Sequence, residues 1–77
     1  MVSVSVGGYL GFYTPGHQRK FEFEADAGLR ISEIIRQLGL PPVEVALISL
    51  NGNLIDDLEV LVPDGAELKL FSATDGG

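Results

Sequence analysis

Only one stretch of this chain has the apolar spacing of an α-helix, and this limits the folds that the chain can form. Ile31, Ile34, Ile35 and Leu38 recur at i, i+3, i+4 and i+7, the stripe that a helix presents to a core. Gly39 suits the position after a helix, and the proline pair that follows prevents continuation. A helix of about eight to ten residues is marginal alone. We therefore expect it to pack on a sheet that the rest of the chain forms.

The segments before and after this helix have the patterns of β-strands. Residues 2–6 alternate valine with serine, and residues 21–25 alternate apolar side chains with glutamate, so each should bury one face. Turn-forming residues at 14–18 make these two segments a hairpin with a long loop. Residues 45–50 are an apolar run of strand length, and residues 68–71 alternate again. The inward side chains expected on the second strand are Phe21, Phe23 and Ala25.

Turn signals connect the strands of the second half. Asn51-Gly52 indicates a type I′ hairpin, with residues 53–55 as the returning arm. Asp56-Asp57 opens a loop with apolar anchors, and a Pro-Asp-Gly turn at 63–65 precedes the last strand. The predicted order is strand, strand, helix, strand, short strand, strand. This order predicts an α+β fold, with a mixed sheet of about four to five strands and one helix packed on one face.

Composition and charge restrict the possible partners. The 77 residues form one domain, and 45% hydrophobic content can supply a core. There is no cysteine, so thiol nucleophiles and thiolate metal sites are excluded. No apolar run is long enough to cross a membrane, so we expect a cytoplasmic protein. The net charge of −6 disfavours nucleic acids and anionic membranes. It suits a protein partner with a basic surface, and equally a domain that simply stays soluble.

The last six residues have too little apolar content to join a core. We expect residues 1–71 to form the domain and residues 72–77 to form a flexible tail that carries a free α-carboxylate. Gly76 and Gly77 have no Cβ, so this end could enter a channel too narrow for other side chains. The carboxylate of Gly77 would be unhindered and open to attack once activated.

An ordered set of short motifs covers essentially the whole chain: the helix pattern of residues 31–39, Pro41-Pro42, Leu50-Asn51-Gly52, Pro63-Asp64-Gly65, Leu68-Lys69-Leu70-Phe71 and Gly76-Gly77. This set resembles the ubiquitin-like sulfur carriers, a β-grasp family. The family includes the small subunit of molybdopterin synthase (MoaD) and the thiamine-pathway carrier (ThiS). Two positions depart from the family pattern: Ala66 replaces a frequent acidic residue, and Ser72-Ala73 replaces a frequent Pro-Pro, so the tail should be less stiff.

The resemblance implies a carrier whose chemistry is supplied by partner enzymes. An E1-like adenylyltransferase with ATP and Mg²⁺ would adenylate the carboxylate of Gly77, and a persulfide sulfur would convert it to a thiocarboxylate. The tail would then deliver sulfur to a synthase, either the large subunit of molybdopterin synthase or thiazole synthase, with molybdopterin preferred. On this reading the chain is not an enzyme and binds no cofactor or metal of its own.

The candidate partner-binding residues are Phe71, Thr74 and Asp75. By alternation, Phe71 faces opposite to its leucine neighbours and so lies away from the helix; the alternative is that it packs under a loop. Phe12 or Ile48 are candidates to join it. The single histidine, His17, is expected to be a solvated turn residue, and Asp56-Asp57 to be a polar loop, because nothing with catalytic or metal-ligand spacing accompanies them.

Two other functions use the same features. A ubiquitin-like modifier would use the same activation to form an isopeptide bond with lysines of other proteins. A β-grasp binding subunit would recognise a partner without covalent chemistry. Loss of Gly77 would abolish sulfur transfer but would leave the non-covalent function intact.

Overall fold

The structure is a computed structural model and describes residues 1–24 and 28–73. The expected inward position of Ala25 therefore lies outside the described residues. The elements in chain order are β1 (Val2–Gly7), the 3₁₀ helices η1 (Gly8–Phe12) and η2 (Pro15–His17), β2 (Lys20–Phe23), β3 (Leu29–Arg30), α1 (Ile31–Gln37), the 3₁₀ helix η3 (Pro42–Glu44), β4 (Val45–Leu50), β5 (Asn53–Ile55), β6 (Leu61–Val62) and β7 (Glu67–Ser72).

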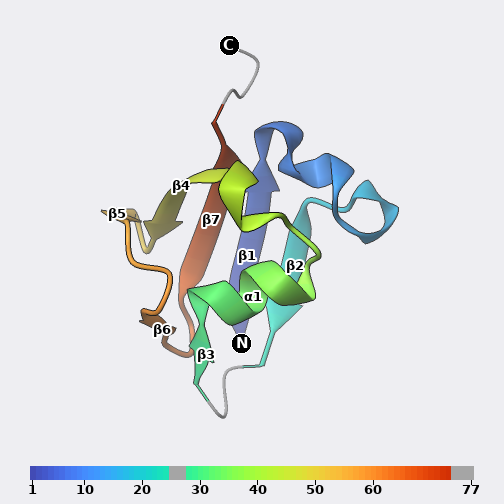
Figure 1. The fold of residues 1–77 in the computed structure, drawn as a ribbon. Helices are drawn as coiled ribbons and strands as arrows, with labels where there is room; N and C mark the ends of the chain where they lie inside the picture. The colour runs from blue at the N-terminus through green and yellow to red at the C-terminus, as the bar shows by residue number, and fades with distance from the viewer. Residues whose placement is uncertain (25–27, 74–77) are drawn as a thin grey trace.

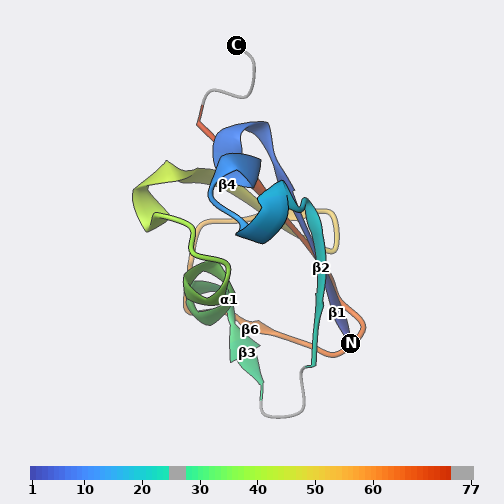
Figure 2. The same ribbon diagram turned by 90° about the vertical axis from the view of Figure 1, so that its right-hand side faces the viewer.

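The main sheet has five strands in the order β2-β1-β7-β4-β5. The central pair, β1 and β7, is parallel, and the other neighbouring strands are antiparallel (Figure 1). The helix α1 lies on one face of this sheet, as the view from the side shows (Figure 2). The fold is therefore α+β with a mixed sheet and one α-helix in the described part of the chain, which confirms the predicted class.

The β1–β2 hairpin has the register that its alternation predicts. Val4 pairs with Phe21, and Ser5 pairs with Lys20. The valines of β1 are buried under α1, whereas Ser3 is exposed on the other face. Because side chains alternate across a strand, one face of this hairpin joins the core and the other meets solvent.

The helix α1 begins and ends with specific hydrogen bonds. The Glu33 carboxylate accepts a hydrogen bond of 2.9 Å from the Arg30 backbone N–H and so closes the first turn. At the other end Gly39 takes a φ of +77°, and the Leu40 N–H donates to the Ile35 carbonyl at 3.1 Å. This is a Schellman motif, which requires a residue that tolerates positive φ, usually glycine, directly after the helix. The helix has seven residues, slightly fewer than predicted.

Between β4 and β5 the chain makes the predicted type I′ turn. Asn51 and Gly52 have φ values of +52° and +85°, and both central residues of this turn type need positive φ. The Asn51 side-chain oxygen also accepts a hydrogen bond of 2.9 Å from the Glu67 N–H. The turn is thereby attached to the start of β7 and helps to hold β4 beside it.

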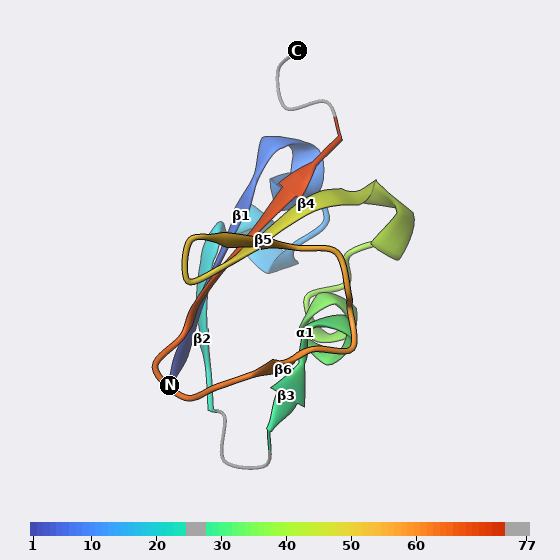
Figure 3. The ribbon, with the colours of Figure 1, turned by 90° about the vertical axis from the view of Figure 1, so that its left-hand side faces the viewer.

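A second, two-stranded sheet was not predicted. The strands β3 and β6 pair Leu29 with Val62 and Arg30 with Leu61. The loop before β6 also accepts hydrogen bonds from the start of α1: Ile31 N–H donates to Val60 O at 3.1 Å and Ser32 N–H to Leu58 O at 2.9 Å. The first N–H groups of a helix have no partner within the helix, so this loop satisfies two of them; it runs beside the start of α1 (Figure 3).

The segment between β1 and β2 forms short 3₁₀ helices. Buried Thr14 organises this segment, because its hydroxyl lies 3.1 Å from the Gly11 carbonyl and 2.6 Å from the Gln18 carbonyl. Leu10 from the same segment is buried in the core. The aperiodic apolar residues of this stretch therefore form a cap at one end of the sheet.

Candidate functional site

The central strand β7 is held on both sides up to its last residue. Its parallel neighbour β1 pairs Gly7 with Phe71, and its antiparallel neighbour β4 pairs Val45 with Ser72. Ser72 is 3% exposed, and its Oγ accepts a hydrogen bond of 2.9 Å from the Tyr9 N–H. Ser72 thus belongs to the sheet and not to the tail in which we expected it. The chain leaves the sheet at a point fixed by η1 (Figure 1).

Phe71 lies on the sheet face opposite to α1, as predicted from alternation. Its ring covers Gly7: a Cβ on Gly7 would lie 2.7 Å from Phe71 Cδ1 and 2.9 Å from Cε1. No side chain fits at Gly7 without moving this ring. The ring is half-buried and lies against the backbone of β1 at Gly7.

An apolar surface surrounds Phe71 on this outer face. Leu47 of β4 pairs directly with Phe71 and is 51% exposed, and Leu54 of β5 is 73% exposed. We call these three residues the outer patch. Leu47 and Leu54 also line an open hollow of about 540 Å³ at the β4–β5 edge. Exposed apolar side chains gathered on one face are typical of protein-binding surfaces.

The expectation that Ile48 joins this surface is wrong. Ile48 is 5% exposed and pairs with Leu70 and Ile55 on the buried face of the sheet. Its neighbour Leu47 occupies the outer face instead. The strand is apolar at both positions, so hydropathy alone does not distinguish them; the pairing with β7 decides which side chain is buried.

Phe12 is 64% exposed and belongs to an aromatic stack on the cap segment. Its ring centroid lies 6.2 Å from that of Tyr9 and 5.9 Å from that of His17, which meets it edge-on. Because the Tyr9 N–H binds Ser72, this stack stands beside the end of β7. His17 is exposed, as expected for a turn residue.

The other sequence candidates do not assemble into a catalytic or metal site. Asp57 Oδ1 accepts a hydrogen bond of 2.9 Å from the Glu59 N–H and so shapes an exposed turn. Within residues 1–24 and 28–73 no three His, Cys, Asp or Glu side chains could hold a metal ion. Thr74, Asp75, Gly76 and Gly77 lie outside the described residues.

The Asp64 carboxyl group has a perturbed pKa at the opposite end of the sheet. The N-terminal ammonium group donates a hydrogen bond to the exposed Asp64 carboxylate, and this bond together with the positive charge lowers the pKa of that carboxyl below its ordinary value of 3.8. None of the helices in the described ranges has both the length and the apolar character that crossing a bilayer requires.

The outer patch and the aromatic stack flank the end of β7. Sequence reasoning missed Leu47, Leu54 and the Ser72 hydrogen bond. Only the outward position of Leu54, beside the predicted Asn51-Gly52 turn, could have been found from alternation. Comparison of the chain with protein-family models, with curated proteins and with solved structures gave no match.

Proposed function

We propose that this chain is a β-grasp sulfur carrier whose working group is the carboxylate of Gly77. The topology supports the β-grasp assignment, since a mixed sheet with a parallel central pair and one helix across it is consistent with that fold. The proposal also draws on the ordered sequence motifs and takes Gly77 as the carboxyl terminus.

The observation that carries the proposal is the anchoring of β7 through Ser72. A carrier must deliver its terminus into a partner's active site, so the chain must leave the domain at a defined point. Ser72 accepts a hydrogen bond from the Tyr9 N–H, and the Phe71 ring contacts Gly7. The position of the last described residue, Ala73, is therefore set by the two residues before it. The outer patch beside this point supplies the apolar contact area that a docking partner needs.

The chemistry needs no acid or base from this domain. A carboxylate is a poor electrophile, and transfer of AMP from ATP, with release of pyrophosphate, gives it a leaving group. A persulfide sulfur of the partner then attacks the acyl carbon and expels AMP, and reduction of the resulting acyl disulfide by a thiol leaves the thiocarboxylate. The domain contributes recognition, position and the acyl terminus.

Pyrophosphate exchange catalysed by the E1-like enzyme of the same host tests the recognition step. Leu47→Ala and Leu54→Ala should each weaken the apparent affinity of the enzyme for the carrier, because they remove apolar area from the outer patch. Leu61→Ala is the matched control, since Leu61 is 53% exposed but lies on β6 beside the helix. Equal effects at all three leucines would show that the outer patch is not the docking surface.

Removal of Gly77 separates the covalent functions from simple binding. Under the proposal this deletion abolishes pyrophosphate exchange while the domain stays folded. If the deletion leaves the biological function intact, a non-covalent binding subunit is the better account. If the activated chain becomes linked to lysines of other proteins, a ubiquitin-like modifier is the better account.

A further inference from the structure

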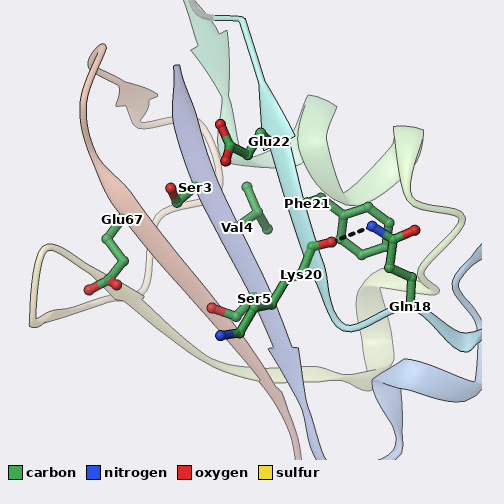
Figure 4. Close-up of a pocket in the computed structure, with 8 residues that line it drawn as sticks. All are labelled: Ser3, Val4, Ser5, Gln18, Lys20, Phe21, Glu22 and Glu67. Carbon is green, nitrogen blue, oxygen red and sulfur yellow. Dashed lines mark hydrogen bonds between the residues drawn. The ribbon is translucent and has the colours of Figure 1, made fainter.

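The outer face of the sheet contains a trough that runs along β1. The outward residues of β1 next to this trough are only Ser3 and Ser5, whereas its two neighbours carry long side chains. The two serines line an open hollow of about 380 Å³. Lys20 and Glu22 of β2 and Glu67 of β7 line it as well. Figure 4 shows Ser3 between Glu22 of β2 and Glu67 of β7. Phe71, lying over Gly7, closes one end of the trough.

The strands β2 and β7 form the two walls of this trough, and beside each of the two serines of β1 they carry charges of the same sign. Ser3 pairs with Glu22 on one side and with Glu67 on the other, so two carboxylates face each other across the floor. Ser5 pairs with Lys20 and with Lys69, so two ammonium groups face each other one row further along. All four charged side chains are exposed. Adjacent strands lie about 4.8 Å apart, so each like-charged pair is separated at the backbone by about 10 Å.

This arrangement is less favourable than one with opposite charges across the floor of the trough. The like charges repel weakly across about 10 Å, while each glutamate attracts the lysine two residues along its own strand at about 6.8 Å. An exchange of Glu67 with Lys69 would make the pairs across the floor attractive without changing the composition. In the described part of the chain no ion pair relieves these four groups, since the pair between the N-terminus and Asp64 lies elsewhere.

We propose that the β1 trough binds an extended segment of a protein partner in which a basic and an acidic side chain stand two residues apart. The basic side chain lies between Glu22 and Glu67, and the acidic one lies between Lys20 and Lys69. In an extended chain such side chains point to the same side and are separated by about 6.6–6.8 Å, which is also the separation of the two rows along β1.

The alternation of charge selects this ligand over other charged molecules. A nucleic acid or another polyanion would meet the carboxylate pair as well as the lysine pair and would be repelled by half of the site. The serine hydroxyls on the floor can donate to the acidic group or accept from the basic one. Because the site is open to solvent, binding should be weak and should weaken further with added salt.

The test is an NMR titration of the full chain, labelled with ¹⁵N, at low ionic strength. The probe is the acetylated and amidated pentapeptide Thr-Arg-Thr-Glu-Thr. The control peptide, Thr-Arg-Thr-Thr-Glu, has the same composition, but its charges point to opposite sides. We expect saturable shifts of the amides of the trough residues Ser3, Ser5, Lys20, Glu22, Glu67 and Lys69, and at least about fivefold weaker binding of the control. Equal binding of the two peptides, or shifts elsewhere, would overturn the proposal.

A charge exchange on one wall provides the second measurement. The double variant Glu67→Lys, Lys69→Glu should bind the probe at least about fivefold more weakly, because each peptide charge then meets one attractive and one repulsive group. Its thermal midpoint should rise by at most about 2 °C at low salt, and the rise should vanish at high salt. The control exchange Arg36→Glu, Glu59→Arg, on the helix side, should leave binding of the probe unchanged. If the Glu67→Lys, Lys69→Glu variant binds the probe peptide as tightly as the parent, the proposed binding site is refuted.

This inference is independent of the proposed sulfur chemistry. Removal of residues 74–77 should leave probe binding unchanged while it abolishes pyrophosphate exchange. Failure of the peptide titration therefore leaves the carrier proposal standing, and failure of the carrier assays leaves the trough standing.

Discussion

Replacement of Gly7 by alanine tests how tightly the end of β7 is held. The backbone of Gly7 is extended, with φ −127° and ψ 174°, so alanine causes no backbone strain there. The only close neighbours of the new Cβ are ring atoms of Phe71 at 2.7 and 2.9 Å. The ring must therefore tilt away from β1 and lose part of its buried area.

The magnitude follows from two opposed terms. Overpacking of a site costs about 1–3 kcal/mol, whereas replacing glycine by alanine inside a strand returns about 0.5–1 kcal/mol. Because Phe71 is half-buried, its ring can give way toward solvent, and the cost should lie at the lower end. We expect Gly7→Ala to lower the free energy of unfolding by at most about 0.5 kcal/mol, or the midpoint by at most about 4 °C.

A double-mutant cycle isolates the contact. In a Phe71→Ala background nothing opposes the new methyl group, so Gly7→Ala should stabilise the protein by about 0.5–1 kcal/mol. Urea unfolding, monitored by circular dichroism, measures the free energy of unfolding of the parent, the two single variants and the double variant. The reasoning is refuted if Gly7→Ala has the same effect in both backgrounds, because its consequence would then not come from the Phe71 ring.

Three further predictions concern separate parts of the fold. Ser72→Ala should cost about 1–2 kcal/mol and accelerate hydrogen exchange of the Tyr9 amide, which loses its acceptor; unchanged exchange at Tyr9 would contradict the anchor. Ile48→Ala should lower the free energy of unfolding by about 2–5 kcal/mol and Leu47→Ala by less than about 0.5 kcal/mol, measured by urea unfolding. The reverse order would mean that the two faces of β4 are misassigned. Acetylation of the N-terminus should return the pKa of Asp64 toward 3.8 in an NMR titration. Because that pKa is lowered on folding, the ion pair contributes stability above about pH 3.8 and loses it as the pH falls through the folded value; equal acid sensitivity of the acetylated protein would contradict this.

The regular elements could be predicted because their signals are local. The alternation of residues 2–6 sets which face of β1 is buried, and the spacing of residues 31–38 sets the face of α1. Asn51-Gly52 determines its turn through two positive φ angles that few other dipeptides tolerate. These patterns are contained within a few neighbouring residues, so no knowledge of distant contacts is needed to interpret them.

The parts that could not be predicted depend on distant contacts. The strands β3 and β6 have two residues each, which is too short for any periodicity to be recognised. The burial of Ser72 depends on Tyr9, which lies 63 positions earlier in the chain. The outer patch depends on the register between β4 and β7, and a continuous apolar run such as residues 45–50 fits either face.

The candidate site was predicted only in its outline. Alternation placed Phe71 on the outer face correctly, but the patch around it is completed by leucines that the sequence did not single out. The proposed role of Gly76 and Gly77 stays a prediction, because these residues lie outside the described part of the chain. The charge rows of the trough become visible only when β2 and β7 are both aligned with β1.

The most direct test of the carrier proposal is the intact mass of the protein after incubation with the E1-like enzyme of its own host, ATP, Mg²⁺ and a persulfide donor. We expect the mass to increase by the difference between sulfur and oxygen, and we expect a variant without Gly77 to remain unchanged. An unchanged mass, with an enzyme shown to be active on another carrier, would contradict the proposal and favour a domain that only binds its partner.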